Sequence, residues 1–172
     1  MNISVRRSLV CVVIMLAGLS QALAMDTDGY ASLAKEVVRG VMSKPVADID
    51  GLIAKQEKLL QIGVTGCLDY AKEHPADSKF LQLVVDNAAA MQALTLEQIE
   101  DQWHDANFPI SHGIDIDSYD HFGPVISLMD TVVHPATGII ALKEYKKTQN
   151  PELLTQVKEE LSEVLEHIQH VN

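Results

Sequence analysis

The chain has 172 residues, of which 24 are acidic and 13 are basic, so its net charge is −11 at pH 7. A surface this acidic repels the phosphates of nucleic acids and of anionic lipids, and it attracts cations and basic proteins. We therefore expect no nucleic-acid binding, and we expect any partner to be a cation or a basic protein. The length suits a single domain with a sizeable apolar core.

The first 24 residues have the pattern of a secretory signal peptide. Arg6 and Arg7 form a positively charged start, residues 9–19 are an apolar core, and the Ala-Leu-Ala of residues 22–24 offers a cleavage site. The apolar run is shorter than the roughly 20 residues that a membrane-spanning helix needs. We therefore expect a cleaved signal and a periplasmic or secreted mature chain, residues 25–172, without a membrane span. Its net charge is −13, because both arginines leave with the signal. An uncleaved N-terminal anchor is the alternative.

Cys67 is the one cysteine of the mature chain. A single cysteine cannot form an internal disulfide, so in an oxidising compartment it is either buried or paired between two chains. Val64, Leu68 and Ala71 surround it at helical spacing, and a buried thiol behaves as a small apolar group. We therefore expect burial, while the oligomeric state stays open.

The predicted elements of the mature chain are all helices, because apolar residues recur at spacings of three and four. The first helix covers residues 29–43, with Asp28 as its N-terminal cap and Pro45 beyond its end. The second begins near Asp50, whose carboxylate can accept the free N–H groups of the first turn.

Two glycines interrupt the second helix. Gly63 and Gly66 each cost about 1 kcal/mol relative to alanine in a helix interior, so the pair indicates either close approach by another helix or a kink. The second helix ends at residues 74–75, His-Pro, and Asp77 or Ser78 caps the third.

A capping box marks the next helix start. Thr95 is followed three residues later by Gln98, so each side chain can satisfy a backbone N–H near the other residue. This helix is predicted to continue through Trp103. Residues 105–118 then show neither a helical nor a strand period, and they contain turn-forming residues. We predict an irregular acidic loop there.

The last third of the chain returns to helix. Pro124 suits a first helical position, and Pro135 either kinks this helix or opens another. Asn150 and Pro151 begin the final helix, which carries an unbroken apolar stripe. Short connections between long amphipathic helices favour antiparallel neighbours. We therefore predict one all-α domain, residues 25–172, folded as an antiparallel up-and-down bundle of four to six helices.

The charge distribution in the middle of the chain is one-sided. Residues 80–142 contain nine acids and neither lysine nor arginine. Such a field raises the pKa of carboxylates and destabilises the fold by self-repulsion unless it is compensated. A bound cation or a basic partner surface would compensate it, and free counterions around a solvated face would do so more weakly.

Five of the seven histidines have a carboxylate four residues before them, which in a helix makes the two side chains neighbours on one face. By helical phase, His134, His167 and His170 project opposite the apolar stripes of their helices, so we expect these three to face solvent. The five pairs are Glu100/His104, Asp117/His121, Asp130/His134, Glu163/His167 and Glu166/His170.

Glu100 and His104 instead flank the apolar face of their helix, at the boundary between core and solvent. The residues that follow add His112, Asp117 and His121 within a short stretch of chain. Imidazole nitrogen and carboxylate oxygen suit Zn, Cu, Fe or Mn. We therefore take these five residues as candidate ligands of a divalent metal. An acidic solvated loop without a metal is the alternative.

Two functions from different classes follow. The first is a cation-binding module of the cell envelope that holds a divalent metal as cofactor. The second is a structural or interaction protein whose acidic face docks a basic partner, with no metal and no catalysis. The sequence contains no Gly-x-Ser-x-Gly elbow and no His-Glu-x-x-His motif, so an enzyme ranks third.

Overall fold

The structure, a computed structural model, describes residues 25–46 and 48–171. Over these residues it contains seven α-helices, one π-helical turn, two 3₁₀ turns and no strand. The predicted all-α class is confirmed, with one helix more than the upper expectation. The predicted signal peptide, residues 1–24, lies outside the described residues.

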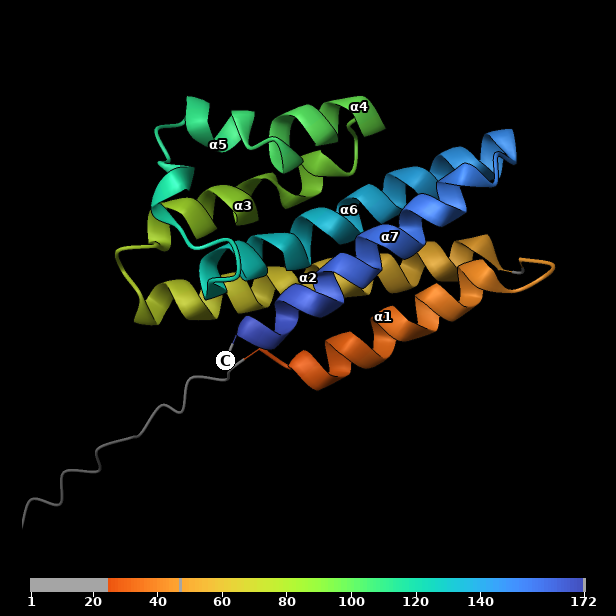
Figure 1. Cartoon of the computed structure of the whole chain (residues 1–172), viewed down its shortest axis with the longest axis horizontal. Helices are drawn as coiled ribbons and strands as arrows, with labels where there is room; N and C mark the ends of the chain where they lie inside the picture. Colours follow the sequence, from red (N-terminus) through yellow and green to blue (C-terminus); the bar gives the residue numbers. More distant parts are fainter. Residues whose placement is uncertain (1–24, 47, 172) are drawn as a thin grey trace, which may run out of the picture.

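Four long helices form the frame of the molecule: α1 (Thr27–Met42), α2 (Ile49–Glu73), α6 (Pro124–Thr148) and α7 (Glu152–His167). Each packs against two of the others in the cyclic order α1, α2, α6, α7. Neighbouring helices in this order run in opposite directions (Figure 1). The four therefore close an up-and-down bundle, as the short connections α1–α2 and α6–α7 favour.

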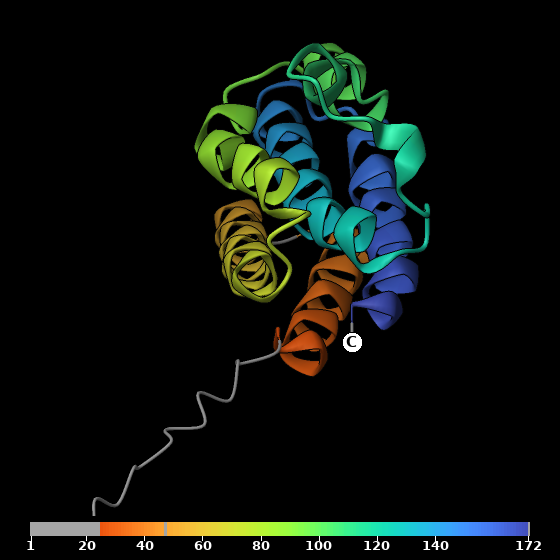
Figure 2. The same ribbon diagram turned by 90° about the vertical axis from the view of Figure 1, so that its left-hand side faces the viewer.

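The chain between α2 and α6 lies outside this four-helix frame. Helix α3 (Ser78–Met91) packs on α2 and α6. The chain then returns through α4 (Leu96–Ile99), the π-helix η1 (Glu100–His104), α5 (Asn107–Ser111) and the 3₁₀ turn η2 (Ile116–Ser118). Seen along the bundle, this return passes over α3 and α6 toward α7 (Figure 2). We call residues 92–123 the roof.

The start of the roof follows the predicted capping box. Gln98 N donates to Thr95 Oγ1 at 3.1 Å, and Thr95 N donates to Gln98 Oε1 at 2.9 Å. The helix then widens into η1, where Asp105 N donates to Glu100 O, five residues back, at 2.9 Å. Single π-turns of this kind often occur at functional sites.

The predicted irregular loop at residues 105–118 needs correction, because it contains the short helix α5 and the turn η2. Ala106 adopts a left-handed conformation, with φ of 59°, and the chain turns there from η1 into α5. Elements of three to five residues are too short to display a helical period, so the sequence pattern could not reveal them.

Two helix starts lie earlier than predicted. Asp26 and Asp48, instead of Asp28 and Asp50, accept a first-turn N–H at 2.9 Å. Both pairs of acids lie two residues apart, and either member provides the carboxylate that an N-terminal cap requires.

Helix α6 is the centre of the fold. It begins with Pro124 at its first turn and continues unbroken past Pro135, and every residue of 125–142 is buried. Helices α2, α7 and α3 and the roof helix α4 all pack against it. Among the described helices, α6 alone is long and apolar enough to cross a membrane, but that apolar window is wholly buried inside the bundle. A core helix passes this test of length and composition equally well.

The contact between α2 and α6 depends on a glycine. A Cβ atom at Gly63 would lie 2.5 Å from the backbone oxygen of Thr131, which confirms the predicted close approach of another helix. Cys67, one turn further along α2, is fully buried, as predicted, and its thiol lies 3.5 Å from Leu128 O. The two longest helices therefore pack almost backbone to backbone.

Candidate metal centre

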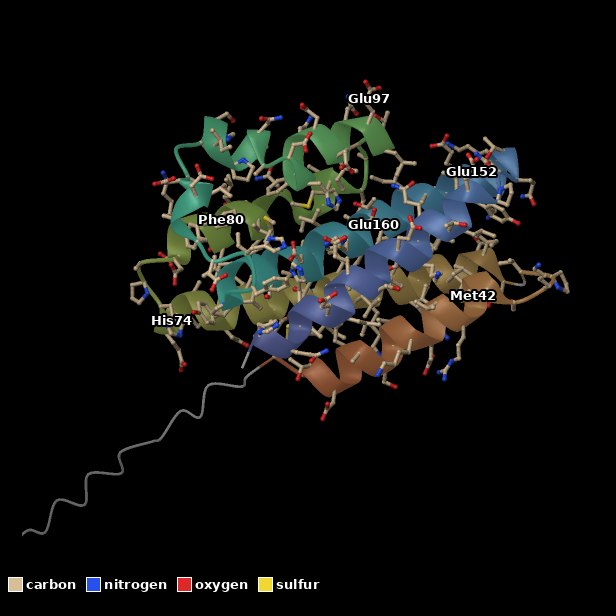
Figure 3. All side chains as sticks on the ribbon, in the orientation of Figure 1. Met42, His74, Phe80, Glu97, Glu152 and Glu160 are labelled. Carbon is tan, nitrogen blue, oxygen red and sulfur yellow. The ribbon has the colours of Figure 1, made fainter. Side chains whose placement is uncertain are left out.

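Four buried polar side chains lie where α6 meets α7. Asp130 and His134 belong to α6, Glu160 and His167 belong to α7, and their exposed fractions are only 6%, 2%, 9% and 3%. Glu160 lies near the middle of the bundle (Figure 3). Ionisable groups are rarely buried to this extent unless they are paired or bind a ligand.

The prediction that His134 and His167 face solvent is wrong. Helical phase gives the angle between side chains, but it does not give the number of neighbours that surround a helix. Helix α6 is enclosed on all sides, and α7 packs against both α1 and α6. The third histidine of that prediction, His170, is exposed, as expected.

Two imidazoles converge on one carboxylate. His134 Nδ1 lies 2.7 Å from Glu160 Oε2, and His104 Nε2 lies 3.7 Å from the same oxygen. Potential ligand atoms of His104, His134 and Glu160 all lie within 4.8 Å of one another. We call these three residues the triad. They come from η1, α6 and α7, so the triad joins the roof to the bundle.

His104 ends the π-turn, and its ring is held by α6. Its Nε2 lies 3.0 Å from Thr137 Oγ1, and the Thr137 hydroxyl donates to Val133 O at 3.1 Å. Because that hydroxyl has a single hydrogen, His104 Nε2 is the donor in the first contact. This proton must leave Nε2, for example by the switch to the Nδ1–H tautomer, before Nε2 can bind a metal.

Asp130 lies behind the triad and faces two imidazoles. Its Oδ2 is 2.5 Å from His167 Nδ1, and its Oδ1 is 3.8 Å from His134 Nε2. His134 thus has Glu160 on one ring nitrogen and Asp130 on the other. A carboxylate behind a ligand histidine fixes the ring orientation and raises its basicity, as is common in metal sites.

The acidic surroundings raise the pKa of two of these rings. Burial lowers the pKa of His134, but the hydrogen bond to Glu160 and the charges of Asp130 and Glu160 outweigh it, so this pKa lies above 6.5. The hydrogen bond to Asp130 raises the pKa of His167 above 6.5, although burial opposes it. A metal at the triad therefore competes with a proton on His134.

Two hollows meet at the triad. A cavity of about 360 Å³, which we call the site cavity, lies among the roof, α6 and α7, and its wall includes His104, Asp117, His121, Asp130, His134 and Glu163. A groove of about 550 Å³, which we call the acidic groove, includes Glu100, His104, Glu152, Glu159, Glu160 and Glu163. His104 lines both.

The five predicted ligands are thus distributed unevenly. His104 belongs to the triad, while Asp117 and His121 are exposed side chains at the site cavity. Glu100 is exposed and lines the acidic groove. His112 lies at the end of α5, with Nδ1 at 2.9 Å from Phe108 O, and it lines neither hollow. Sequence reasoning missed His134 and Glu160.

Comparisons of the chain with protein-family models, with curated proteins and with solved structures give no match.

The triad fits a transition-metal ion in donor chemistry and nearly in geometry. Zn–N and Zn–O bonds of about 2.0–2.2 Å place the donors of a tetrahedral site about 3.4 Å apart. The triad atoms already lie within 4.8 Å of one another. With the ligand nitrogens of His104 and His134 free of protons, small rotations of the rings and the carboxylate would bring the donors to coordinating distance.

Proposed function

We propose that this protein is a divalent-metal-binding module of the cell envelope, with His104, His134 and Glu160 as the ligands. The observation that carries the proposal is the convergence of two imidazole nitrogens on one largely buried carboxylate oxygen. Asp130 supports it, because this carboxylate faces the second nitrogen of His134 at 3.8 Å.

The chemistry of the three donor atoms limits which metals can bind. Two imidazole nitrogens and one carboxylate oxygen suit Zn, Cu, Fe or Mn, whereas Ca and Mg are bound through oxygen ligands alone. Of the five ligands predicted from the sequence, only His104 is a ligand in this proposal. Glu100, Asp117 and His121 line the neighbouring hollows, and His112 lines neither of them.

The uncompensated charge of residues 80–142 gives the binding of a cation an electrostatic reason. That segment contains nine acids and four histidines but no lysine or arginine. A divalent ion at the triad would place two positive charges beside Asp130, Glu160 and Glu163. The attraction is strongest for Asp130 and Glu160, because these two carboxylates are largely buried.

The test uses the untagged mature chain after chelator treatment. Calorimetric titration with Zn, Cu, Fe(II) under anaerobic conditions, Mn and Ca should show one site for at least one transition metal and none for Ca. At a free metal concentration of about a hundred times the dissociation constant, the folded state should gain about 2.7 kcal/mol, seen as a rise in Tm that EDTA reverses.

Matched variants locate the site. His134→Gln and Glu160→Gln should each abolish the rise in Tm, whereas His112→Gln and His170→Gln, at exposed positions, should retain it. Unchanged melting with every metal would overturn the proposal. Equal binding by the wild type and the two triad variants would do the same.

A further inference from the structure

We infer that a metal ion at the triad keeps one coordination position open to the site cavity, and that this cavity admits a small neutral nitrogen base with an apolar body as the additional ligand. This inference rests on the proposed function and adds the chemical class of a ligand to it.

The number of protein donors leaves a position free. Among the described residues, the group of ligand atoms within 4.8 Å of one another has three members and no fourth histidine, cysteine or carboxylate. Zinc takes four ligands, and sites with three protein donors hold water or substrate in the fourth position. Cu, Fe and Mn leave at least as many positions open.

The open coordination position faces the site cavity. His104 and His134 both form part of the wall of the site cavity, whereas Glu160 lies on the side of the acidic groove. A metal between the two rings and Glu160 therefore lies at the boundary of the site cavity. Its volume of about 360 Å³ falls in the range of small-molecule sites.

The walls of the cavity define what it accepts. One side is apolar, and the residues that form it include Trp103, Ile116, Ile126, Met129 and Val133. Three carboxylates line it, Asp117, Asp130 and Glu163, and the lining residues that can carry a positive charge are histidines, with neither lysine nor arginine among them.

The carboxylates of this wall together with Glu160 outnumber the two charges of a divalent ion and the one charge of a protonated His167, so the loaded cavity stays negative and disfavours anions by charge repulsion. A neutral nitrogen base avoids that repulsion, binds the metal through its lone pair and places an apolar body against the aromatic and aliphatic wall. The nitrogen lone pair of such a base therefore suits the metal, and its apolar body suits the apolar wall of the site cavity.

The test compares two probes with the same donor atom. Co(II) is loaded onto the wild-type chain first, and its visible absorption reports the loaded site. Imidazole and 4-phenylimidazole are then titrated. Both should shift the cobalt bands, and 4-phenylimidazole should bind at least about tenfold more tightly, because its phenyl ring is buried against the apolar wall.

Filling the two hollows in turn shows which one the probe enters. Met129→Trp and Ile126→Phe fill the site cavity, and each should remove the preference for 4-phenylimidazole. Thr155→Trp fills the acidic groove, which Thr155 lines from an exposed position, and it should keep the preference. Cobalt affinity, measured before any base is added, verifies that each variant retains a folded site.

The outcomes separate this inference from the proposed function. A chain that binds no cobalt contradicts both. Cobalt bands that form but respond to neither base contradict only the open position, and loss of the metal to the base does so too. Equal affinity for the two bases, or a preference that Thr155→Trp removes and Met129→Trp does not, contradicts the assignment to the site cavity.

Discussion

Asp130 Oδ2 lies 2.5 Å from Nδ1 of His167, at the end of α7. This contact joins the second turn of α6 to the last turn of α7, and both side chains are buried. The other oxygen of the same carboxylate faces His134 Nε2. One carboxylate therefore faces a triad histidine and also contacts a residue near the C-terminus of the described chain.

Replacing Asp130 should weaken metal binding without removing a ligand. Asp130→Asn keeps the size of the side chain but loses the charge that favours and orients His134, so the metal dissociation constant should rise about 10- to 100-fold. Calorimetric titration measures this change. Asp117→Asn, at an exposed position on the same cavity, is the control and should change affinity much less. Equal affinities for Asp130→Asn and the wild type would refute the supporting role of Asp130.

The metal-free protein should lose stability as the pH rises above about 6.5. The pKa values of His134 and His167 are raised in the folded state by their contacts with Glu160 and Asp130. Their contribution to the free energy of unfolding is therefore complete below the unfolded value of 6.5 and is lost as the pH rises through the folded values. Urea denaturation between about pH 6 and about pH 9 measures the decline.

Variants assign this pH dependence to the buried rings. The charged or titratable groups near them are Asp130, Glu160 and Glu163, with His104, whose ring centre lies 5.0 Å from that of His134, and His121, whose ring centre lies 4.9 Å from that of His167. His167→Gln should flatten the decline, whereas His170→Gln, at an exposed site, should leave it unchanged. A free energy of unfolding that increases over this pH range would show that protonation of these rings does not stabilise the fold.

Gly63 should tolerate no side chain, in contrast to Gly40. Gly63→Ala forces a Cβ against the backbone oxygen of Thr131 and should lower the free energy of unfolding by about 1–3 kcal/mol. At Gly40 the nearest atom is the tip of the Leu52 side chain, which can rotate away. Gly40→Ala should therefore be neutral or gain up to about 1 kcal/mol from helix propensity. Equal stability of the two variants in urea denaturation would contradict the close packing of α2 on α6.

The acidic groove should speed the entry of metal. Glu152 and Glu159 are exposed on α7 beside the triad residue Glu160, and a hollow lined by one sign of charge concentrates ions of the opposite sign. The double variant Glu152→Gln/Glu159→Gln should lower the association rate at least about threefold at low salt. The difference should vanish near 1 M salt, where the Debye length falls to about 3 Å.

Stopped-flow mixing measures these association rates. The control removes two exposed acids from α2, Glu57 and Glu73, and it should leave the rate nearly unchanged. A similar loss in both double variants would mean that the net charge of the protein, and not the groove, attracts the metal.

Local sequence signals predicted the fold well. The capping box at Thr95, the close approach at Gly63 and the burial of Cys67 each depend on one residue and its near neighbours. The short connections α1–α2 and α6–α7 then favour antiparallel packing. Such features follow from chemistry within a few residues.

The site was harder to predict, because its residues come from distant segments. His104 was identified from its position at the edge of an apolar face. The prediction that His134 faces solvent is wrong, since phase alone does not show that α6 is enclosed on every side. The available signal was the composition of α6, which is apolar around its whole circumference and has no lysine or arginine before Lys143. A helix of that kind lies inside a bundle, so its polar residues must pair there.

The roof, residues 92–123, lies outside the four-helix frame and packs on it through α4. His134 and Glu160 belong to α6 and α7, which pack directly against each other. His104 alone arrives on a segment of short helical turns, and such segments open at a smaller free-energy cost than the core. Under the proposed function, release of the ion would then need the movement of one ligand, His104, while α6 and α7 stay packed. The residence time of the ion would then depend on the roof, whereas the global stability of the protein would depend on the four-helix frame.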